Sequence, residues 1–266
     1  NYKMILEPIN QQHLFGLHNY LLDFIKLYQN DKFPSKILLS GEEGLGKSTL
    51  AYHFVNYVLS INQDFQYDLK KFQINLNNKS YKLTINGSNP NLFLIDTVSE
   101  KKKIDINQIR DLISKLNKSS FNDKERFIII DNIDKLNINS INALLKILEE
   151  PPKNTFFIMI NNDRFILPTL KSRCINFKLF LDHQSVIDTT NKLIGSDIFK
   201  YINHDLLNYY STPGKLYKLV NFFKSNNYNL YDYKTKDFLK LIIKENLYKK
   251  DIFIKNIFFE YFELHL

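Results

Sequence analysis

Residues 126–174 read RFIIIDNIDKLNINSINALLKILEEPPKNTFFIMINNDRFILPTLKSRC. The stretch contains two short apolar runs, at 127–130 and 156–160, and between them apolar residues recur at helical spacing until two prolines at 151–152. Short β-branched runs without polar alternation are typical of strands buried on both faces of a parallel sheet. The prolines stop the helix. The stretch therefore predicts a strand–helix–strand unit, with Asp131 at the sheet edge where open α/β folds bind ligands.

Upstream, residues 41–48 read GEEGLGKS and follow the apolar run at 36–40. They fit G-x-x-x-x-G-K-S, in which glycines turn backbone N–H groups toward phosphate oxygens, the lysine reaches the β- and γ-phosphates and the serine holds Mg²⁺. A helix begins at the next residue and directs its positive end at the anion. The alternative is a degenerate P-loop that keeps its shape without binding, but every motif residue is present. The predicted nucleotide-binding residues are Gly41, Gly44, Gly46, Lys47, Ser48, Thr49 and Asp131, with Ser48 and Asp131 holding Mg²⁺ through ATP or ADP.

The totals are those of a globular protein. The chain has 266 residues, of which 44% are hydrophobic and 24% charged, enough for one α/β domain and a smaller one. No apolar run is long enough to cross a bilayer, so we expect a cytoplasmic protein. The single cysteine, Cys174, excludes an internal disulfide and a cysteine-based zinc site. The net charge of +8 permits a nucleic-acid partner, although solvated surface lysines would give the same value.

Two longer strings carry a family resemblance. Residues 142–152 read NALLKILEEPP and residues 167–174 read LPTLKSRC, and together they resemble two boxes of the clamp-loader branch of the AAA+ ATPases. An ordinary core helix with a proline stop would explain the leucines but not the second string at the family's spacing. Residues 104–112, IDINQIRDL, also resemble a helix start typical of one subunit family in this branch, delta prime.

The resemblance implies a fold and a division into domains. We expect a P-loop AAA+ domain of the α/β class at 1–178, with a RecA-like parallel sheet and flanking helices. A small helical lid would follow at 179–226, and a reduced or truncated helical collar at 227–266. Within the lid, helices are expected over 183–195, 197–210 and 213–224.

Two positions depart from the pattern of ATP-hydrolysing members of this family. Their central strand usually ends in Asp-Glu, where the glutamate polarises the attacking water, but this chain has Asp131-Asn132. Asparagine is neutral and cannot act as a general base. Gly214 falls where hydrolysing subunits usually place a lid arginine. The resemblance therefore implies that the chain binds ATP or ADP with Mg²⁺ but does not turn it over by itself.

The resemblance also assigns two residues outside the P-loop. Asn161 falls at sensor 1, a polar side chain that faces the γ-phosphate, and Asn162 is a one-residue alternative. Both could be ordinary turn residues, because asparagine favours turns. Arg173 falls at the arginine finger, which acts in trans by completing the ATP site of the neighbouring subunit. For an isolated arginine, a surface ion pair with an acid would be the simpler explanation.

These positions imply a role in replication. We expect a delta prime-type subunit that helps a DNA polymerase III clamp loader to place the sliding clamp on primed DNA, as a component of a polymerase holoenzyme. The implied partners are gamma/tau and delta subunits in a hetero-oligomeric ring, the clamp and primer–template DNA, with no membrane. The alternatives are a gamma/tau-like motor that hydrolyses ATP and an unrelated nucleotide kinase, for which no acceptor motif is visible. Family members often carry a four-cysteine zinc module at the position of residues 61–86, where this chain has no cysteine, so no zinc site is expected.

Overall fold

The computed structural model describes residues 7–97, 103–117, 124–209 and 211–263. The chain forms two compact units, Asn1–Phe180 and Leu181–Leu266. The first unit contains a five-stranded parallel sheet in the order β2-β3-β4-β1-β5, which confirms the predicted α/β fold class. The strands are β1 (Lys36–Ser40), β2 (Leu92–Ile95), β3 (Arg126–Ile130), β4 (Thr155–Asn161) and β5 (Ile175–Lys178).

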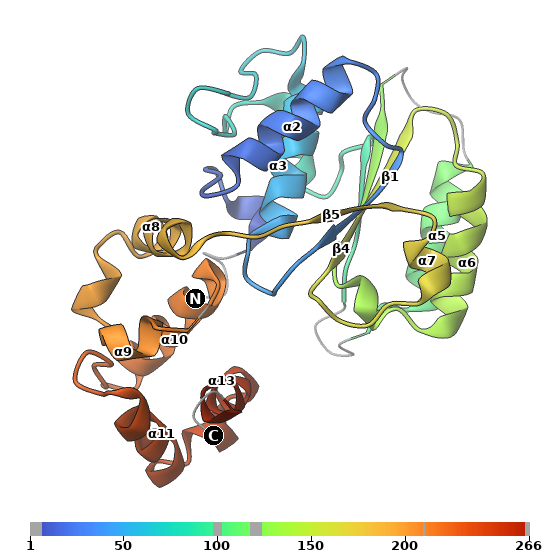
Figure 1. The fold of residues 1–266 in the computed structure, drawn as a ribbon. Coiled ribbons are helices and arrows are strands. Elements are labelled where there is room, and N and C mark those ends of the chain that lie inside the picture. The colour runs from blue at the N-terminus through green and yellow to red at the C-terminus, as the bar shows by residue number, and fades with distance from the viewer. Residues whose placement is uncertain (1–6, 98–102, 118–123, 210, 264–266) are drawn as a thin grey trace. The chain divides into compact units, whose positions relative to one another are not determined.

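Helices cover both faces of the sheet (Figure 1). Helices α2 and α3 lie on one face, and α5, α6 and α7 lie on the other. The helical elements of this unit are η1 (Pro8–Asn10), α2 (His18–Gln29), α3 (Lys47–Ser60), α4 (Lys79–Ile85), α5 (Ile106–Leu116), η2 (Ile133–Lys135), α6 (Ile138–Glu149) and α7 (Pro168–Lys171).

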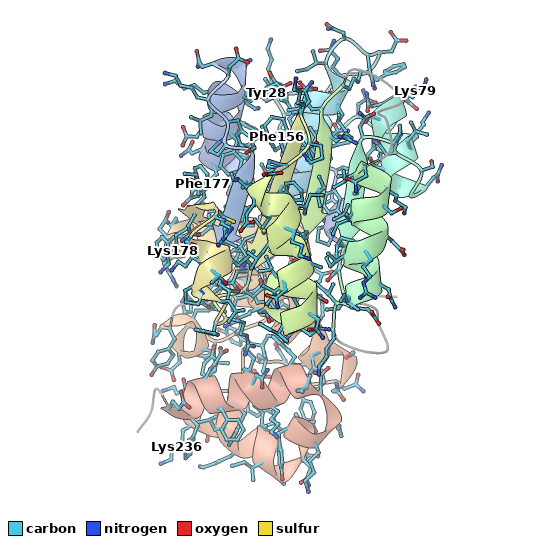
Figure 2. All side chains as sticks on the ribbon, turned by 90° about the vertical axis from the view of Figure 1, so that its right-hand side faces the viewer. Tyr28, Lys79, Phe156, Phe177, Lys178 and Lys236 are labelled. Atoms are coloured by element: carbon cyan, nitrogen blue, oxygen red, sulfur yellow. The ribbon has the colours of Figure 1, made fainter. Side chains whose placement is uncertain are left out.

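The two faces of the sheet carry different side chains, because residues along a strand point alternately to opposite faces. On β3, the ring of Phe127 lies 6.1 Å from that of Phe54 on α3, whereas Ile128 packs with apolar residues of α5 and α6. Phe156 and Phe177, which are labelled in Figure 2, belong to the aromatic side. From residue 127 to residue 130, strand β3 is apolar and buried because both of its faces are covered.

Strand β5 has no counterpart among the predicted strands. Three of its four residues are exposed, so it lacks the buried apolar run that reveals the other strands in the sequence. Backbone pairing with β1, in which Ile175 lies opposite Ile37, holds it at the edge of the sheet. Because β5 begins at Ile175, this pairing also fixes the chain just after Arg173.

The second unit is helical. The segment 197–210, predicted as one helix, is instead divided, because Asp197 caps a short 3₁₀ turn and Asn203 caps a separate helix. The division of this unit into a lid at 179–226 and a collar at 227–266 stays a prediction. Among the described residues, no helix is both long and apolar enough to span a lipid bilayer. The elements are α8 (His183–Ile194), η3 (Ile198–Lys200), α9 (His204–Leu207), α10 (Pro213–Ser225), α11 (Thr235–Lys244), α12 (Leu247–Lys250) and α13 (Ile252–Glu263).

Candidate nucleotide-binding site

The segment between β1 and α3 forms a glycine-rich turn. Gly41, Gly44 and Gly46 have φ angles of 144°, 90° and 89°, which residues with a side chain rarely adopt. A Cβ atom at Gly41 would stand 2.7 Å from the carbonyl oxygen of Leu179. Gly46 caps α3, so the N–H groups of residues 47–49 have no partner within the helix and lie at its positive end. The turn is therefore a cradle of backbone donors that only glycine permits.

Lys47 is placed inside this turn. Its side chain is buried, and its Nζ donates to the carbonyl oxygens of Gly41 at 2.7 Å and Glu42 at 2.6 Å. Burial lowers the pKa of Lys47 to about 8, while the charges of Asp131 and Asp163 oppose that shift. An anion in the cradle would offer the ammonium group a stronger acceptor than a neutral carbonyl does.

Ser48 and Asp131 meet at the mouth of the turn. The Ser48 hydroxyl donates to Oδ2 of Asp131, which directly follows β3. Burial raises the pKa of Asp131, and the nearby carboxylate of Asp96 acts in the same direction. Hydroxyl, carboxylate and phosphate oxygens are the ligands that Mg²⁺ prefers. The glycine cradle, the buried lysine and this pair therefore fit the phosphates of a nucleotide with its Mg²⁺.

A row of polar side chains runs along the carboxyl ends of β2, β3 and β4. The Asn132 Nδ2 donates to Asp96 Oδ1 at 2.8 Å, and its Oδ1 accepts from Asn162 Nδ2 at 2.9 Å. Asn132 also has a positive φ of 53°, and its backbone N–H donates to Asp131. Asn132, where the sequence comparison expects a glutamate in ATP-hydrolysing relatives, thus has both its amide nitrogen and its amide oxygen hydrogen-bonded. A carboxylate here would lie against the carboxylate of Asp96, and like charges repel.

Asn161 closes a turn rather than pointing into open space. Its Nδ2 donates to the carbonyl oxygen of Arg164 at 2.9 Å, and its Oδ1 accepts from the Arg164 N–H at 3.3 Å. It lies next to Ser40, the last residue of β1, and is buried. Of the two sensor 1 candidates, Asn162 is the one whose amide reaches the end of β3.

Arg173 and the glycine turn lie at opposite ends of the parallel strands. The turn follows the carboxyl end of β1, whereas Arg173 precedes β5, which runs parallel to β1. Its Nη2 lies 2.6 Å from Oε1 of Glu149, and its Nη1 donates to the carbonyl oxygen of Thr169 at 2.7 Å. The length of a five-residue strand, about 16 Å, therefore separates Arg173 from the phosphate cradle of its own chain.

Comparison with known proteins decides the family. Residues 17–182 match the family described as "DNA polymerase III, delta subunit". The chain belongs to this family. The DNA polymerase III subunit delta' of Pseudomonas aeruginosa is 30% identical over 139 residues, which cover 52% of this chain and 40% of that protein. These matches confirm the predicted resemblance to delta prime subunits.

Two further relatives are more distant. The tau subunit of Bacillus subtilis is 28% identical over 194 residues, or 72% of this chain and 32% of that protein. A crystal structure of a gamma subunit-related protein from Thermotoga maritima aligns with 20% identity and a TM-score of 0.42, covering 82% of this chain and 66% of that one. The chain spans less than half the length of the curated relatives it matches.

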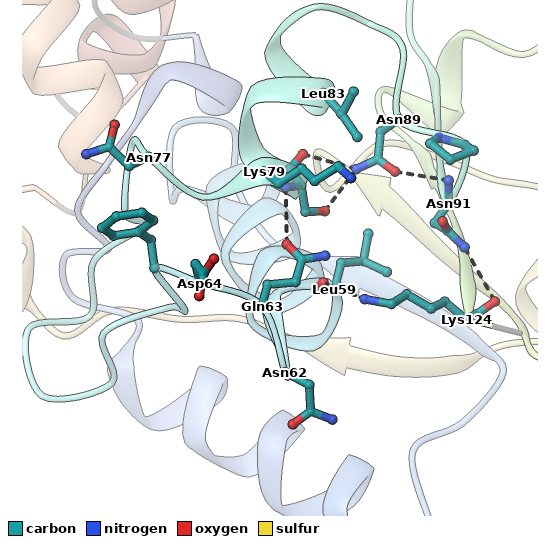
Figure 3. A pocket seen from close by; sticks show the side chains of 13 residues that line it. Leu59, Asn62, Gln63, Asp64, Asn77, Lys79, Leu83, Asn89, Asn91 and Lys124 are labelled. Carbon is teal, nitrogen blue, oxygen red and sulfur yellow. Dashed lines mark hydrogen bonds between the residues drawn. The ribbon is translucent and has the colours of Figure 1, made fainter. Parts of the chain in front are cut away.

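The segment after α3, where the family's zinc module would fall, is held by side-chain amides. Asn78 is buried and caps α4, and its Nδ2 donates to Gln63 Oε1 at 3.1 Å. Asn89 donates to the carbonyl oxygen of Ser80 at 3.2 Å. Beside these amides lies an open hollow of about 580 Å³ (Figure 3). Among the described residues, no group of three or more His, Cys, Asp or Glu side chains could hold a metal ion.

Gly214 and Lys215 lie in the first turn of α10, which Thr212 caps. The Nζ of Lys215 lies 3.1 Å from Glu260 Oε1 on α13. The interpretation of Gly214 as the position of a missing lid arginine stays a prediction.

The sequence pattern alone did not single out Asp96, Asp163 or Glu149. Asp96 directly follows β2 and touches Asn132, and Asp163 raises the pKa of Lys47. A signal for the first was present, because an acid that follows a predicted strand reaches the same sheet edge as Asp131. Glu149 carried no such signal, since it is one of two consecutive acids at the end of α6.

A buried histidine on the helix that follows the P-loop leads to a prediction about pH. His53 on α3 is fully buried; its Nε2 lies 3.0 Å from the Gln11 carbonyl oxygen and its Nδ1 lies 2.8 Å from the Tyr67 hydroxyl. Burial lowers the pKa of His53 to about 4 from its ordinary 6.5, and the charges of His13 and His18 add to this. The fold therefore favours the neutral imidazole, whereas the unfolded chain takes up a proton below its ordinary pKa of 6.5. The contribution of the neutral imidazole, about 3 kcal/mol at most, is present above pH 6.5 and is lost as pH falls toward 4.

We therefore expect the stability difference between the wild type and His53→Gln to shrink as the pH falls from 7 to 4. Urea unfolding at several pH values measures it. His183→Gln, at an exposed position on α8, is the matched control and should not change the pH profile. A difference between wild type and His53→Gln that stays constant with pH would contradict the assignment.

Proposed function

We propose that this chain is a delta prime-type subunit of a DNA polymerase III clamp loader. In this role it binds ATP or ADP with Mg²⁺, does not hydrolyse it at a useful rate, and supplies Arg173 to the ATP site of the neighbouring subunit. Its partners would be gamma/tau and delta subunits, the sliding clamp and primer–template DNA. Membership of the family supports the assembly, and the geometry of the P-loop and of Arg173 supports the division of labour.

Nucleotide binding is supported by the cradle itself. The first-turn N–H groups of α3 and the ammonium group of Lys47 would surround the β- and γ-phosphates. Ser48 and Asp131 are placed to hold Mg²⁺, which would neutralise phosphate charge. Thr49, in the same helical turn, would contribute its backbone N–H group.

The observation that carries the absence of turnover is the amide of Asn132. A general base must accept a proton from the attacking water, and base catalysis is worth about 10²–10⁴-fold in rate. An amide cannot accept that proton, and both of its ends are already bonded, to Asp96 and Asn162. The phosphate contacts do not depend on this side chain, so binding and turnover are separable.

The position of Arg173 supports action in trans. The residue lies at the amino ends of the parallel strands, whereas the P-loop of the same chain lies at their carboxyl ends. Arginine suits a phosphate site because its guanidinium stays charged and presents a planar fork of donors. A nucleotide that Arg173 contacts would therefore belong to another subunit.

The second candidate is a gamma/tau-like motor, which the matched tau subunit of Bacillus subtilis favours. The complete P-loop agrees with it, while Asn132 and Gly214 oppose it. The two functions differ in one measurable quantity, the turnover of ATP by the chain itself.

We expect the purified chain to bind a fluorescent ATP analogue and to show no steady-state ATPase above background, with or without primed DNA. It should also co-purify with tagged gamma/tau and delta subunits. Turnover at the rate of a motor ATPase would favour the gamma/tau-like alternative. Binding without co-purification would leave a nucleotide-binding protein outside the clamp loader, and would reject the proposal.

A further inference from the structure

Arg173 is held by contacts from two other parts of the fold. The carboxylate of Glu149, the last residue of α6, lies 2.6 Å from Nη2, and the carbonyl oxygen of Thr169 accepts from Nη1 at 2.7 Å. The next residue anchors this turn, because Cys174 packs against the core and its Sγ donates to the Leu170 carbonyl oxygen at 3.3 Å. The guanidinium is thus fixed from both of its terminal nitrogens.

We propose that Glu149 is a positioning residue that orients the guanidinium of Arg173 toward the nucleotide of the neighbouring subunit. The proposal rests on the proposed function of Arg173 as a finger in trans. It adds that the finger works at full rate only while Glu149 holds it, in the way that a second group orients a catalytic side chain.

The bonding pattern leaves the guanidinium able to act while it is held. A guanidinium carries five N–H groups, and one on each terminal nitrogen is used by Glu149 and Thr169. Three N–H groups remain without a partner among the described residues. The side chain of Arg173 is 34% exposed, so part of it can be reached by a ligand from outside this chain. Arg173 can therefore keep its contact with Glu149 and still present a fork to a ligand.

The pair is poorly explained by stability. The side chain of Glu149 is 54% exposed, and exposed ion pairs contribute little to folding. A carboxylate at the carboxyl end of a helix is also unfavourable, because that end carries the negative side of the helix dipole. Glu149 and the adjacent Glu150 share this disadvantage, but only Glu149 has the contact with Arg173. This difference makes Glu150 a matched control.

The test uses the clamp-loader complex reconstituted with gamma/tau and delta subunits. The finger-dependent rate is defined as the DNA- and clamp-stimulated ATPase of the wild-type complex minus that of the Arg173→Ala complex. Misplacing a catalytic group by about 1 Å can cost about 100-fold, so we expect Glu149→Ala to reduce the finger-dependent rate about 10-fold or more. Glu149→Gln, which keeps an oxygen acceptor, should recover part of it, and Glu150→Ala should leave it unchanged.

Two further measurements separate positioning from a structural role. The thermal midpoint of Glu149→Ala and its co-purification with the partners should equal those of the wild type. In an Arg173→Ala background, Glu149→Ala should have no additional effect, because two residues that act as one unit are not additive.

The outcomes distinguish the proposal from the function on which it rests. If Arg173→Ala leaves the ATPase unchanged, the finger itself is absent and both fail. If Arg173→Ala lowers the rate but Glu149→Ala does not, or if the two effects add, only the positioning role is overturned. A rate that rises in Glu149→Ala would also overturn it, since Glu149 would then restrain the finger instead of orienting it.

Discussion

Lys47→Ala is expected to weaken the binding of ATP and ADP by about 100-fold or more. The Lys47 ammonium group is buried and already lies within the glycine turn, 2.7 Å from the Gly41 carbonyl oxygen and 2.6 Å from that of Glu42. Losing a buried charged contact costs about 3 kcal/mol or more, which corresponds to about two powers of ten in affinity. Titration with a fluorescent ATP analogue measures the change.

The control for this experiment must separate lost binding from lost folding. Removing Lys47 also removes its hydrogen bonds to the buried Gly41 carbonyl and the partly buried Glu42 carbonyl, so the thermal midpoint of each variant has to be recorded. Lys47→Met keeps the apolar stem and tests the charge alone. Lys79→Ala removes an exposed lysine at the start of α4 and should leave binding unchanged. A folded Lys47→Met protein with wild-type affinity would show that the charge of Lys47 does not contribute to nucleotide binding, and would contradict this prediction.

Features that depend on neighbours in the sequence were predictable. The P-loop is set by the spacing of its glycines and its lysine, and the strands at 36–40, 127–130 and 156–160 are revealed by buried apolar runs that both faces of the sheet require. The helix before Pro151 is fixed by its periodicity and by the proline stop. Each of these signals lies in neighbouring residues, so the elements could be predicted without knowing which distant segments pack against them.

Features that depend on distant segments were not predictable in the same way. The contact of Asn132 with Asp96 joins residues 36 positions apart, and only the parallel arrangement of β2 and β3 brings their carboxyl ends together. The pairing of Arg173 with Glu149 spans 24 positions. Strand β5 is held by its pairing with β1 while most of its side chains are exposed, and therefore it left no apolar signal.

The geometry of Asn132 changes how its departure from the family pattern is interpreted. A missing glutamate can be read as a simple loss, but the amide here has gained two partners, a carboxylate on one side and an amide on the other. An amide can donate to the first and accept from the second, which a carboxylate cannot do. The polar row therefore places a bonded amide, and not a carboxylate, directly after Asp131, beside a glycine turn that is complete.

Arg173→Ala is expected to slow hydrolysis at the ATP site of the neighbouring subunit by about 10³-fold or more, while the fold of this subunit and its assembly stay intact. In phosphoryl transfer, negative charge spreads over the oxygens of the transferred group, and an arginine supplied by a neighbour is worth about 10³–10⁵-fold. The residue is partly exposed and its ion pair lies at the surface, so its loss removes little packing. The stimulated ATPase rate of the whole complex should fall by the part of the rate that this one site contributes. It should fall further if hydrolysis at the sites is coupled.

Arg173→Lys separates the effect of the positive charge from that of the guanidinium geometry. Lysine keeps the positive charge but lacks the planar fork that contacts Glu149 and Thr169 and that would, in the proposed role, also contact a phosphate group, so we expect it to restore little of the lost rate. Reconstituted complexes with each variant are compared by ATPase and by clamp loading on primed DNA, with Lys171→Ala, an exposed residue at the end of α7, as the control. Full activity in Arg173→Lys would mean that charge alone suffices at this position. Full activity in Arg173→Ala would mean that the ion pair with Glu149 is an ordinary surface contact, and that the neighbouring site draws its transition-state stabilisation from another residue.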